Sequence, residues 1–221
     1  MYEIEKGIHD ESVAAALREA LTDNARISEK EVRAILKSTL DGKGTSRVND
    51  DEYHDLMMIL RMSRTITDHS RSFMVEHLAR YYVLKGPYIY SKVKGLEGKA
   101  KVSNKACAGL VQWYTKVGAA KNWRQGIAVK GNGGKIKKGT AVATFVDGFY
   151  PNKPRGNHAA LYLSQDSRGV LVMDQWSGPS KPTISSRQML FKARNADGTF
   201  IDPSNNGAAL SVVMTRYTIL I

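Results

Sequence analysis

The chain has 221 residues, of which 42% are hydrophobic and 24% charged, a composition typical of a soluble globular protein. No apolar run approaches the roughly 20 residues that a transmembrane helix needs, which argues against a helical membrane protein. The single cysteine, Cys107, excludes an internal disulfide, and the net charge of +12 favours an anionic partner.

The charge is unevenly distributed along the chain. Residues 1–85 carry 13 Lys and Arg against 15 Asp and Glu, whereas residues 86–221 carry 20 against 6. This change predicts two domains, a small helical one over 1–85 and a second over 86–221. The basic surface of the second domain favours nucleic acid, anionic lipid or anionic cell-wall polymer as a partner. A purely solubilising role for the charge is the alternative.

The first half has the apolar periodicity of amphipathic helices. Residues 27–40 open with Ser28 and Glu31, the pattern of a capping box, and continue with an apolar stripe. Short polar loops separate the segments, so a compact four-helix unit is predicted. The other segments with helical spacing are 10–21, 50–63 and 68–84.

A weak internal repeat aligns residues 26–36 with residues 47–57. Counted from Asp41 as position 1, Glu52 falls at position 12 of a calcium-binding loop. Lys43 stands at position 3, where such a loop has an oxygen ligand. We therefore predict an EF-hand-like helix–loop–helix that does not hold calcium tightly. The histidines of this half lack the spacing of a zinc site, and we expect packing or surface roles for His54, His69 and His77.

The second half is predicted to be a helix followed by an antiparallel sheet. The helix covers residues 105–118 and contains Cys107 near its start. One helix before a set of antiparallel strands indicates an α+β fold. Alternation and β-branched residues predict strands at 140–146, 157–163, 169–176 and 210–220.

His158 is the only histidine of the second domain, and it begins a predicted strand. The turn after that strand ends at Gly169, which is placed to supply a positive φ. A hairpin closed by this turn brings His158 and Asp174 to neighbouring positions on adjacent strands. Asp174 is one of only 6 carboxylate residues in this domain, so its predicted position beside the histidine is informative.

These three residue types in this arrangement suit thiol catalysis. A thiol is mostly protonated at neutral pH, but the first turn of a helix and an adjacent histidine lower its pKa. Cys107 is then the nucleophile, His158 the general base and acid, and Asp174 the group that orients the imidazole. No cofactor and no metal ion are expected. The competing interpretation is that Cys107 is a packed structural thiol, the usual role of a lone cysteine.

Three stretches resemble the NlpC-type cell-wall cysteine peptidases, which have a papain-like fold. "ACAGLVQW" resembles the nucleophile motif of that family around Cys107 and includes Gln112. "GPYIY" places Tyr88 where the family uses a tyrosine at the oxyanion site, and "NHAALYL" matches the strand of the catalytic histidine. The resemblance implies that Tyr88 helps hold the oxyanion. We further predict that Gln112 and Trp176 contribute to substrate binding.

The departures from that family point to a narrower group. Ala106 and Ala108 replace the usual Asp and Ser beside the cysteine, and Asp174 fills the third catalytic position. A Cys-His-Asp set resembles the amidase and endopeptidase toxins that bacteria inject through the type VI secretion system. This resemblance implies synthesis in the cytoplasm, action in the periplasm of a target bacterium, and neutralisation in kin by an immunity protein. The opening "MYEIEKGIHDES" has no signal-peptide pattern, which agrees with that route.

The leading hypothesis is a peptidoglycan amidase or DL-endopeptidase that cleaves stem-peptide amide bonds, acts as a monomer and contacts a secretion-system component. The alternative keeps the fold and makes the protein a cysteine protease or acyltransferase acting on a protein or lipid of a target cell. A non-enzymatic nucleic-acid-binding protein is the third hypothesis. It is disfavoured because aromatic residues do not interleave with the Lys and Arg clusters and no DNA-binding motif is present.

Overall fold

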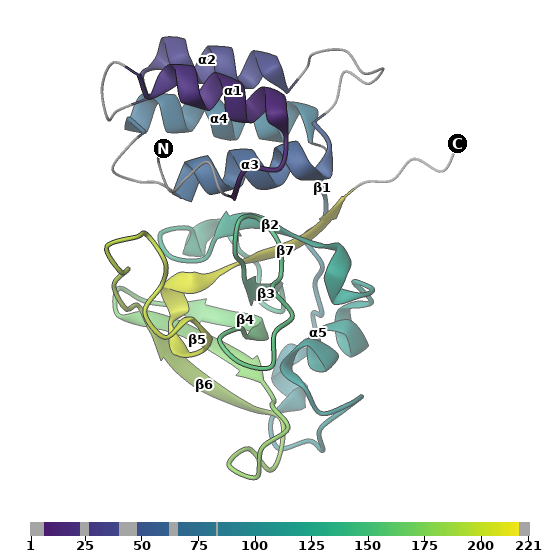
Figure 1. Cartoon of the computed structure of the whole chain (residues 1–221). Helices are drawn as coiled ribbons and strands as arrows, with labels where there is room; N and C mark the ends of the chain where they lie inside the picture. Colours follow the sequence, from purple (N-terminus) through teal and green to yellow (C-terminus); the bar gives the residue numbers. More distant parts are fainter. Residues whose placement is uncertain (1–6, 23–26, 40–47, 62–65, 83, 217–221) are drawn as a thin grey trace. The chain divides into compact units, whose positions relative to one another are not determined.

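The computed structural model divides the chain into two compact units, Met1–Leu84 and Lys85–Ile221 (Figure 1). Among the residues that it describes, no helix is both long and apolar enough to cross a membrane. The described residues are 7–22, 27–39, 48–61, 66–82 and 84–216.

The described part of the first unit is helical, and each helix begins at a side chain that caps it. Asp10 accepts hydrogen bonds from backbone N–H groups of the first turn of α1, and Thr67 does the same for α4. The predicted capping box of Ser28 and Glu31 is confirmed at the start of α2. The helices are α1 (Glu11–Ala20), α2 (Glu29–Ser38), α3 (Asp50–Arg61) and α4 (Asp68–Tyr81).

Only the second part of the predicted calcium loop belongs to the described residues, because residues 41–47 lie outside them. Glu52, at position 12 of that loop, is buried and forms a second capping box with Asn49. The Asn49 N–H donates to Glu52 Oε2 (2.6 Å), and the Glu52 N–H donates to Asn49 Oδ1 (2.9 Å). The carboxylate that would ligate calcium therefore caps α3, and the EF-hand-like character of the loop stays a prediction.

A buried carboxylate of α3 holds the start of α1. Asp55 has an exposed fraction of 0% and accepts backbone N–H groups from His9 (3.0 Å) and Asp10 (2.8 Å). Nδ1 of His54 lies 3.1 Å from its Oδ1, and the His54 ring stacks on His9 at a centroid distance of 4.3 Å. His9, His54 and Asp55 thus offer three possible ligand atoms within 4.8 Å of one another. Stacked rings do not aim their in-plane lone pairs at one ion, and N–H donors occupy the carboxylate, so we interpret the cluster as a packing contact.

Asp55→Ala is expected to lower the free energy of unfolding of the first unit by about 3 kcal/mol, because buried N–H donors lose a charged acceptor. Urea unfolding followed by far-UV circular dichroism measures this loss. All three tryptophans lie in residues 86–221, so the tryptophan fluorescence transition should not move. Asp51→Ala, at an exposed position of the same helix, should cost less than about 1 kcal/mol. Equal losses in the two variants would contradict the assignment.

The second unit is built on a seven-stranded sheet of order β1-β7-β3-β4-β5-β6, with β2 also paired to β7. The predicted mixture of a helix and an antiparallel sheet is confirmed. Three strands were not predicted. β1 has only two residues, and the Arg, Gln, Gly and Ser residues of β2 and β6 interrupt the β-branched pattern. The strands are β1 (Leu84–Lys85), β2 (Trp123–Ala128), β3 (Ala141–Thr144), β4 (Ala159–Gln165), β5 (Gly169–Asp174), β6 (Ser185–Leu190) and β7 (Leu210–Arg216). The helices are α5 (Cys107–Thr115) and the 3-10 turns η2 (Val93–Leu96), η3 (Ala120–Asn122), η4 (Gly133–Lys135), η5 (Pro203–Asn205) and η6 (Gly207–Ala209).

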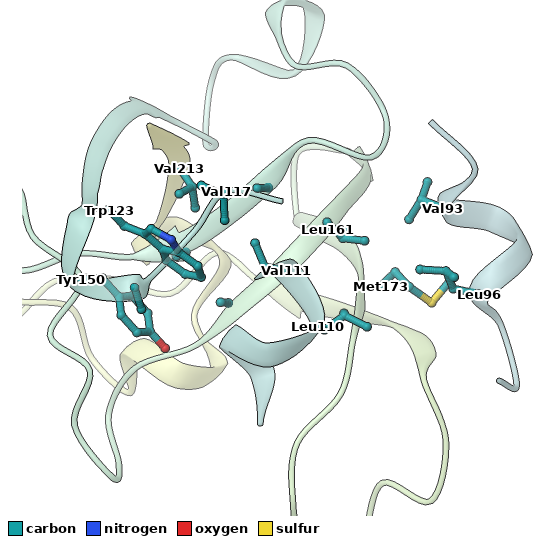
Figure 2. Close-up of a cluster of buried hydrophobic side chains, with 14 of the residues drawn as sticks. Val93, Leu96, Leu110, Val111, Val117, Trp123, Tyr150, Leu161, Met173 and Val213 are labelled. Atoms are coloured by element: carbon teal, nitrogen blue, oxygen red, sulfur yellow. The ribbon is translucent and has the colours of Figure 1, made fainter. Parts of the chain in front are cut away.

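Both faces of this sheet are buried, and α5 packs against one of them (Figure 2). Leu161 of β4 belongs to the cluster that contains Leu110 and Val111 of α5, whereas the next residue, Tyr162, belongs to a second cluster. This alternation is what a strand buried on both faces requires. Each fully buried leucine stabilises the fold by roughly 1.5–3 kcal/mol. The packing fixes the start of α5 relative to the strands that carry the polar residues described below.

The β4–β5 hairpin has a register slightly different from the predicted one. Leu161 pairs with Met173, and continuing this register places Asp174 opposite Ala160. His158 is two residues before Ala160, so His158 and Asp174 are diagonal neighbours instead of direct partners. Diagonal side chains on one face are still close enough for long or aromatic groups to touch.

The predicted positive φ of Gly169 is wrong, since Gly169 is the first residue of β5. The turn is closed by Asp166, whose Oδ1 accepts the N–H groups of Arg168 (2.8 Å) and Gly169 (2.9 Å). Glycine is needed here for a different reason. A Cβ at this position would lie 2.5 Å from the carbonyl oxygen of Met189 on the neighbouring strand.

Candidate active site

Cys107 is the first residue of α5, where helical N–H groups lack helical partners. The preceding residue, Ala106, occupies the N-cap position and makes no side-chain cap hydrogen bond. A Ser, Thr or Asp at this position would accept from N–H groups of the first turn. With alanine there, no N-cap side chain competes for those donors, and they can stabilise negative charge that develops next to Sγ.

The loop that leads into α5 is held in an unusual conformation. Ser103 and Lys105 have φ values of 54° and 62°, in the left-handed region. Asn104 Oδ1 accepts the N–H of Ala106 (3.1 Å). A Cβ on Gly109 would lie 2.5 Å from that same oxygen, so the loop can cross α5 only because this helical residue has no side chain.

Gln175, which sequence analysis did not single out, anchors this loop to the end of β5. It is fully buried, and its Oε1 accepts the N–H of Val102 (3.0 Å). Its Nε2 donates to the carbonyl oxygens of Val102 (3.0 Å) and Ala106 (2.9 Å). Three hydrogen bonds from one buried amide fix the segment that presents Cys107. In the sequence, the only indication of a role for Gln175 is its position next to Asp174.

His158 lies directly before β4 and is positioned by β3. Its N–H donates to Thr144 Oγ1 (2.9 Å), and its carbonyl oxygen accepts the Thr144 N–H (2.9 Å). Its Nε2 lies 2.8 Å from Oδ2 of Asp174. Because Nε2 is engaged there, Nδ1 is the ring nitrogen left for Cys107, whose pKa the neighbouring imidazole lowers. The structure thus brings Cys107, His158 and Asp174 together.

The electrostatics favour charge separation between the thiol and the imidazole. Burial raises the pKa of Cys107, but the hydrogen bond and charge of His158 outweigh burial and lower this pKa. Burial lowers the pKa of His158, while hydrogen bonds to Asp174 and Cys107 raise it, and the net shift is upward. These opposite shifts favour a thiolate–imidazolium pair.

Asp174 remains ionised although it is buried. Burial raises its pKa, but His158, Arg187 and Lys181 lower it to about 2. Lys181 Nζ lies 2.6 Å from Oδ1, and Arg187 Nε lies 2.6 Å from Oδ2. Neither cation was identified from the sequence. Arg187 reaches the carboxylate through the pairing of β5 with β6, and Lys181 reaches it from the connection between these strands.

Tyr150 is a second residue of the site that sequence analysis missed. Its hydroxyl lies 3.7 Å from Cys107 Sγ and accepts a hydrogen bond from Asn157 Nδ2 (2.9 Å). Burial, followed by the negative charge of Cys107, raises the pKa of Tyr150, so the phenol stays protonated. With Asn157 donating to the oxygen, the phenol's own proton is free to point at Sγ.

The other predicted site residues lie elsewhere or at the margin. The Tyr88 hydroxyl is 2.6 Å from Thr215 Oγ1, and no described contact joins it to Cys107. Gln112 donates to the Gly118 carbonyl oxygen (3.0 Å) near the other end of α5. The Trp176 ring, by contrast, is within 4.8 Å of Lys181 Nζ, beside Asp174.

Tyr150→Phe is expected to raise the pKa of the Cys107 thiol, because the variant removes a donor to the thiolate. Alkylation by iodoacetamide at about pH 6.5 should slow by roughly tenfold, the effect of one hydrogen bond to a charged group. Tyr88→Phe removes the same hydroxyl from the other candidate tyrosine and should leave the rate nearly unchanged. A larger effect of Tyr88→Phe would restore Tyr88 as the tyrosine of the site.

Comparison with known proteins concerns the second unit. Residues 82–210 match the family described as domesticated amidase effector 2. A type VI secretion amidase effector 2 protein of Salmonella typhi is 47% identical over 133 residues, which cover 58% of this chain and 98% of that protein. A domesticated amidase effector 2 of Ixodes scapularis is 38% identical over 81 residues, which cover 34% of this chain and 54% of that protein.

A solved structure of the same kind of protein has a similar fold. The structure of a type 6 secretion amidase effector 2 superposes with a TM-score of 0.56 and 44% identity, covering 60% of this chain and 97% of that one. The residues from Cys107 to Arg187 lie within the matched range of 82–210, whereas α1 to α4 precede it.

Proposed function

Since this chain belongs to the domesticated amidase effector 2 family, we propose that it is a peptidoglycan amidase delivered into target bacteria by type VI secretion, with Cys107 as its nucleophile. One observation carries the catalytic part of the proposal. A lone cysteine at a helix start contacts a buried histidine, and that histidine bonds a buried carboxylate. This is the order of groups that thiol amidases require.

In the first half of the reaction, Nδ1 of His158 takes the thiol proton, and Sγ of Cys107 attacks the carbonyl carbon of a stem-peptide amide. The carbonyl oxygen becomes an oxyanion beside the start of α5. Backbone N–H groups of the first turn and the Tyr150 hydroxyl are the donors nearest to that position. Asp174 keeps the imidazole oriented and stabilises the imidazolium.

In the second half, the imidazolium of His158 gives its proton to the nitrogen of the departing amine, and the C–N bond breaks. The acyl group is left on Sγ as a thioester. Water then loses a proton to Nδ1 and attacks the thioester carbon. Return of the proton to Sγ regenerates the thiol and releases the carboxylic acid, so this sequence requires no cofactor or metal ion.

The charge of the second unit suits the proposed location. Residues 86–221 carry 20 Lys and Arg against 6 Asp and Glu, which favours adsorption to an anionic cell wall. We propose action in the periplasm, delivery through a contact with a secretion-system component, and inhibition by an immunity protein in the producing cell. Trp176, beside the catalytic carboxylate, is the aromatic residue that we propose for contact with the substrate.

Mass spectrometry of fragments released from purified peptidoglycan tests this function. New amino and carboxyl termini within the stem peptide are expected with the wild-type protein and should be missing with Cys107→Ala. The fragment masses also identify the bond, which distinguishes an amidase at the glycan junction from a DL-endopeptidase. If a folded wild-type protein with a reactive thiol releases nothing from any wall type, the function would shift to a protein or lipid substrate.

A further inference from the structure

A second layer of charge lies behind the His158–Asp174 pair. Asp174 is fully buried and is in contact with His158 Nε2, Lys181 Nζ and Arg187 Nε at 2.8, 2.6 and 2.6 Å. An orienting carboxylate needs only its histidine to fix the tautomer. Here the carboxylate has two cations in addition, so the buried cluster carries an excess of positive charge.

Both cations are held in place by further contacts. Lys181 is 4% exposed, and its Nζ also donates to the Ser185 carbonyl oxygen (2.9 Å). Arg187 donates through a terminal nitrogen to Asn205 Oδ1 (3.1 Å). Both side chains lie against the Trp176 ring, at 4.8 Å for Lys181 and 5.3 Å for Arg187. Two long side chains fixed in this way are part of the folded site and not a transient surface pairing.

The positive charges of Lys181 and Arg187 shift the titrations of Cys107 and His158 in the same direction. A buried carboxylate with one histidine partner is desolvated, and it can take the proton of the imidazolium instead of orienting it. Two cations hold the carboxylate ionised. They also favour negative charge on Sγ and oppose positive charge on the imidazole, so they shift the titrations of Cys107 and His158 to lower pH together.

We infer that Lys181 and Arg187 are positioning residues that keep Asp174 ionised and set the pH range in which Cys107 and His158 exist as a thiolate–imidazolium pair. The inference rests on the proposed role of Cys107 as the nucleophile. It goes beyond that role because two residues outside the Cys-His-Asp set, Lys181 and Arg187, determine the pH range in which the thiolate–imidazolium pair exists.

Other ionisable or charged groups around the pair come from two further segments. Tyr150, between β3 and β4, contacts Sγ and stays protonated because its pKa is raised. Lys101, in the loop before α5, donates to the Trp176 carbonyl oxygen (3.1 Å) and adds to the positive charge. The substitutions below leave both residues in place, so their contribution is constant.

The pH dependence of iodoacetamide alkylation tests the inference without any substrate, since Cys107 is the only cysteine of the chain. The profile of alkylation rate against pH should have two limbs. Along the limb at lower pH the thiolate–imidazolium pair forms, and along the limb at higher pH the imidazolium loses its proton. Lys181→Met and Arg187→Gln each remove one cation, and both limbs should move to higher pH by about one unit. Asp174→Asn removes the anion, and both limbs should move to lower pH.

Three further variants separate charge from structure. Lys181→Arg and Arg187→Lys keep the charge and should return the limbs toward the wild-type positions. Lys192→Met removes a cation that pairs with Asp202 (2.6 Å) at the surface, and its profile should coincide with the wild type. A purely structural role would slow alkylation at every pH without moving the limbs.

Limbs of Lys181→Met and Arg187→Gln that stay at the wild-type pH would overturn the inference. If Lys181→Met does not fold, Arg187→Gln decides alone, because the Arg187 side chain is 24% exposed and tolerates the change better. A wild-type profile with a single rise near about pH 8.5, the value of a free thiol, would instead refute the proposed nucleophile. Wild-type protein with two limbs that releases no wall fragments would leave the positioning role intact and change the substrate.

Discussion

Cys107→Ala is expected to lower the rate of stem-peptide cleavage by at least about 10⁴-fold, the order of loss seen when a catalytic nucleophile is removed. Alanine cannot form the thioester on which both halves of the proposed reaction depend. The free energy of unfolding should change by less than about 2 kcal/mol, because Cys107 is half-buried and packs only at the margin of the core. The rate is measured as free amino groups released from purified peptidoglycan, and stability by urea unfolding.

The wild-type protein offers a chemical control for this variant. Iodoacetamide can modify only Cys107, so the alkylated protein should lose activity to the same extent as Cys107→Ala without any change of sequence. Cleavage that persists in both preparations would show that another group attacks the amide.

Local patterns were enough to predict the helical first unit. The apolar spacing of residues 27–40 and the pair Ser28 and Glu31 act within a few residues of one another, and α2 begins where they indicate. The start of α5 was predicted at residue 105, two residues before its observed start at Cys107, and Ala106 offers no side-chain cap there. Helix starts are predictable because the cap and the first turn are close in sequence.

Hairpin geometry gave the contact between His158 and Asp174 but not its register. The pairing changes by one residue at the irregularity between Tyr162 and Ser164, and from there Asp174 comes to lie opposite Ala160, two residues from His158. The contact between His158 and Asp174 forms nevertheless, because side chains on one face also meet diagonally across adjacent strands.

The groups that tune the site were not predictable, because each depends on a distant segment. Gln175 reaches the loop before α5 across 73 residues, and Tyr150 reaches Cys107 across 43. Lys181 and Arg187 look in the sequence like ordinary surface cations. Only the fold of the β5–β6 hairpin and its connection shows that both charges converge on Asp174. The sequence therefore predicts the three candidate catalytic residues, whereas the groups that shift their pKa values are placed by contacts between distant segments.

In the proposed mechanism, the reactivity of the Cys107 thiol depends on His158. Its hydrogen bond and charge lower the pKa of Cys107 against burial, and Asp174 raises its own pKa. In the proposed thiolate–imidazolium pair, the cysteine is charged and the histidine protonated over the pH range between the two pKa values. Below this range the thiol is protonated, and above it the imidazole is neutral and cannot protonate the leaving amine. Cleavage should therefore have a bell-shaped pH profile.

His158→Ala is expected to reduce cleavage by about 10³–10⁴-fold and to abolish this bell. Without the imidazole, burial dominates and raises the pKa of Cys107, so alkylation at about pH 6.5 should slow by more than tenfold. The alkylation profile should then show a single rise at or above about pH 8.5. His69→Ala, on α4 with 71% of its side chain exposed, should keep the wild-type profile. If alkylation of His158→Ala still rises below pH 7, a group other than His158 must activate the thiol, since no other histidine is present in residues 86–221.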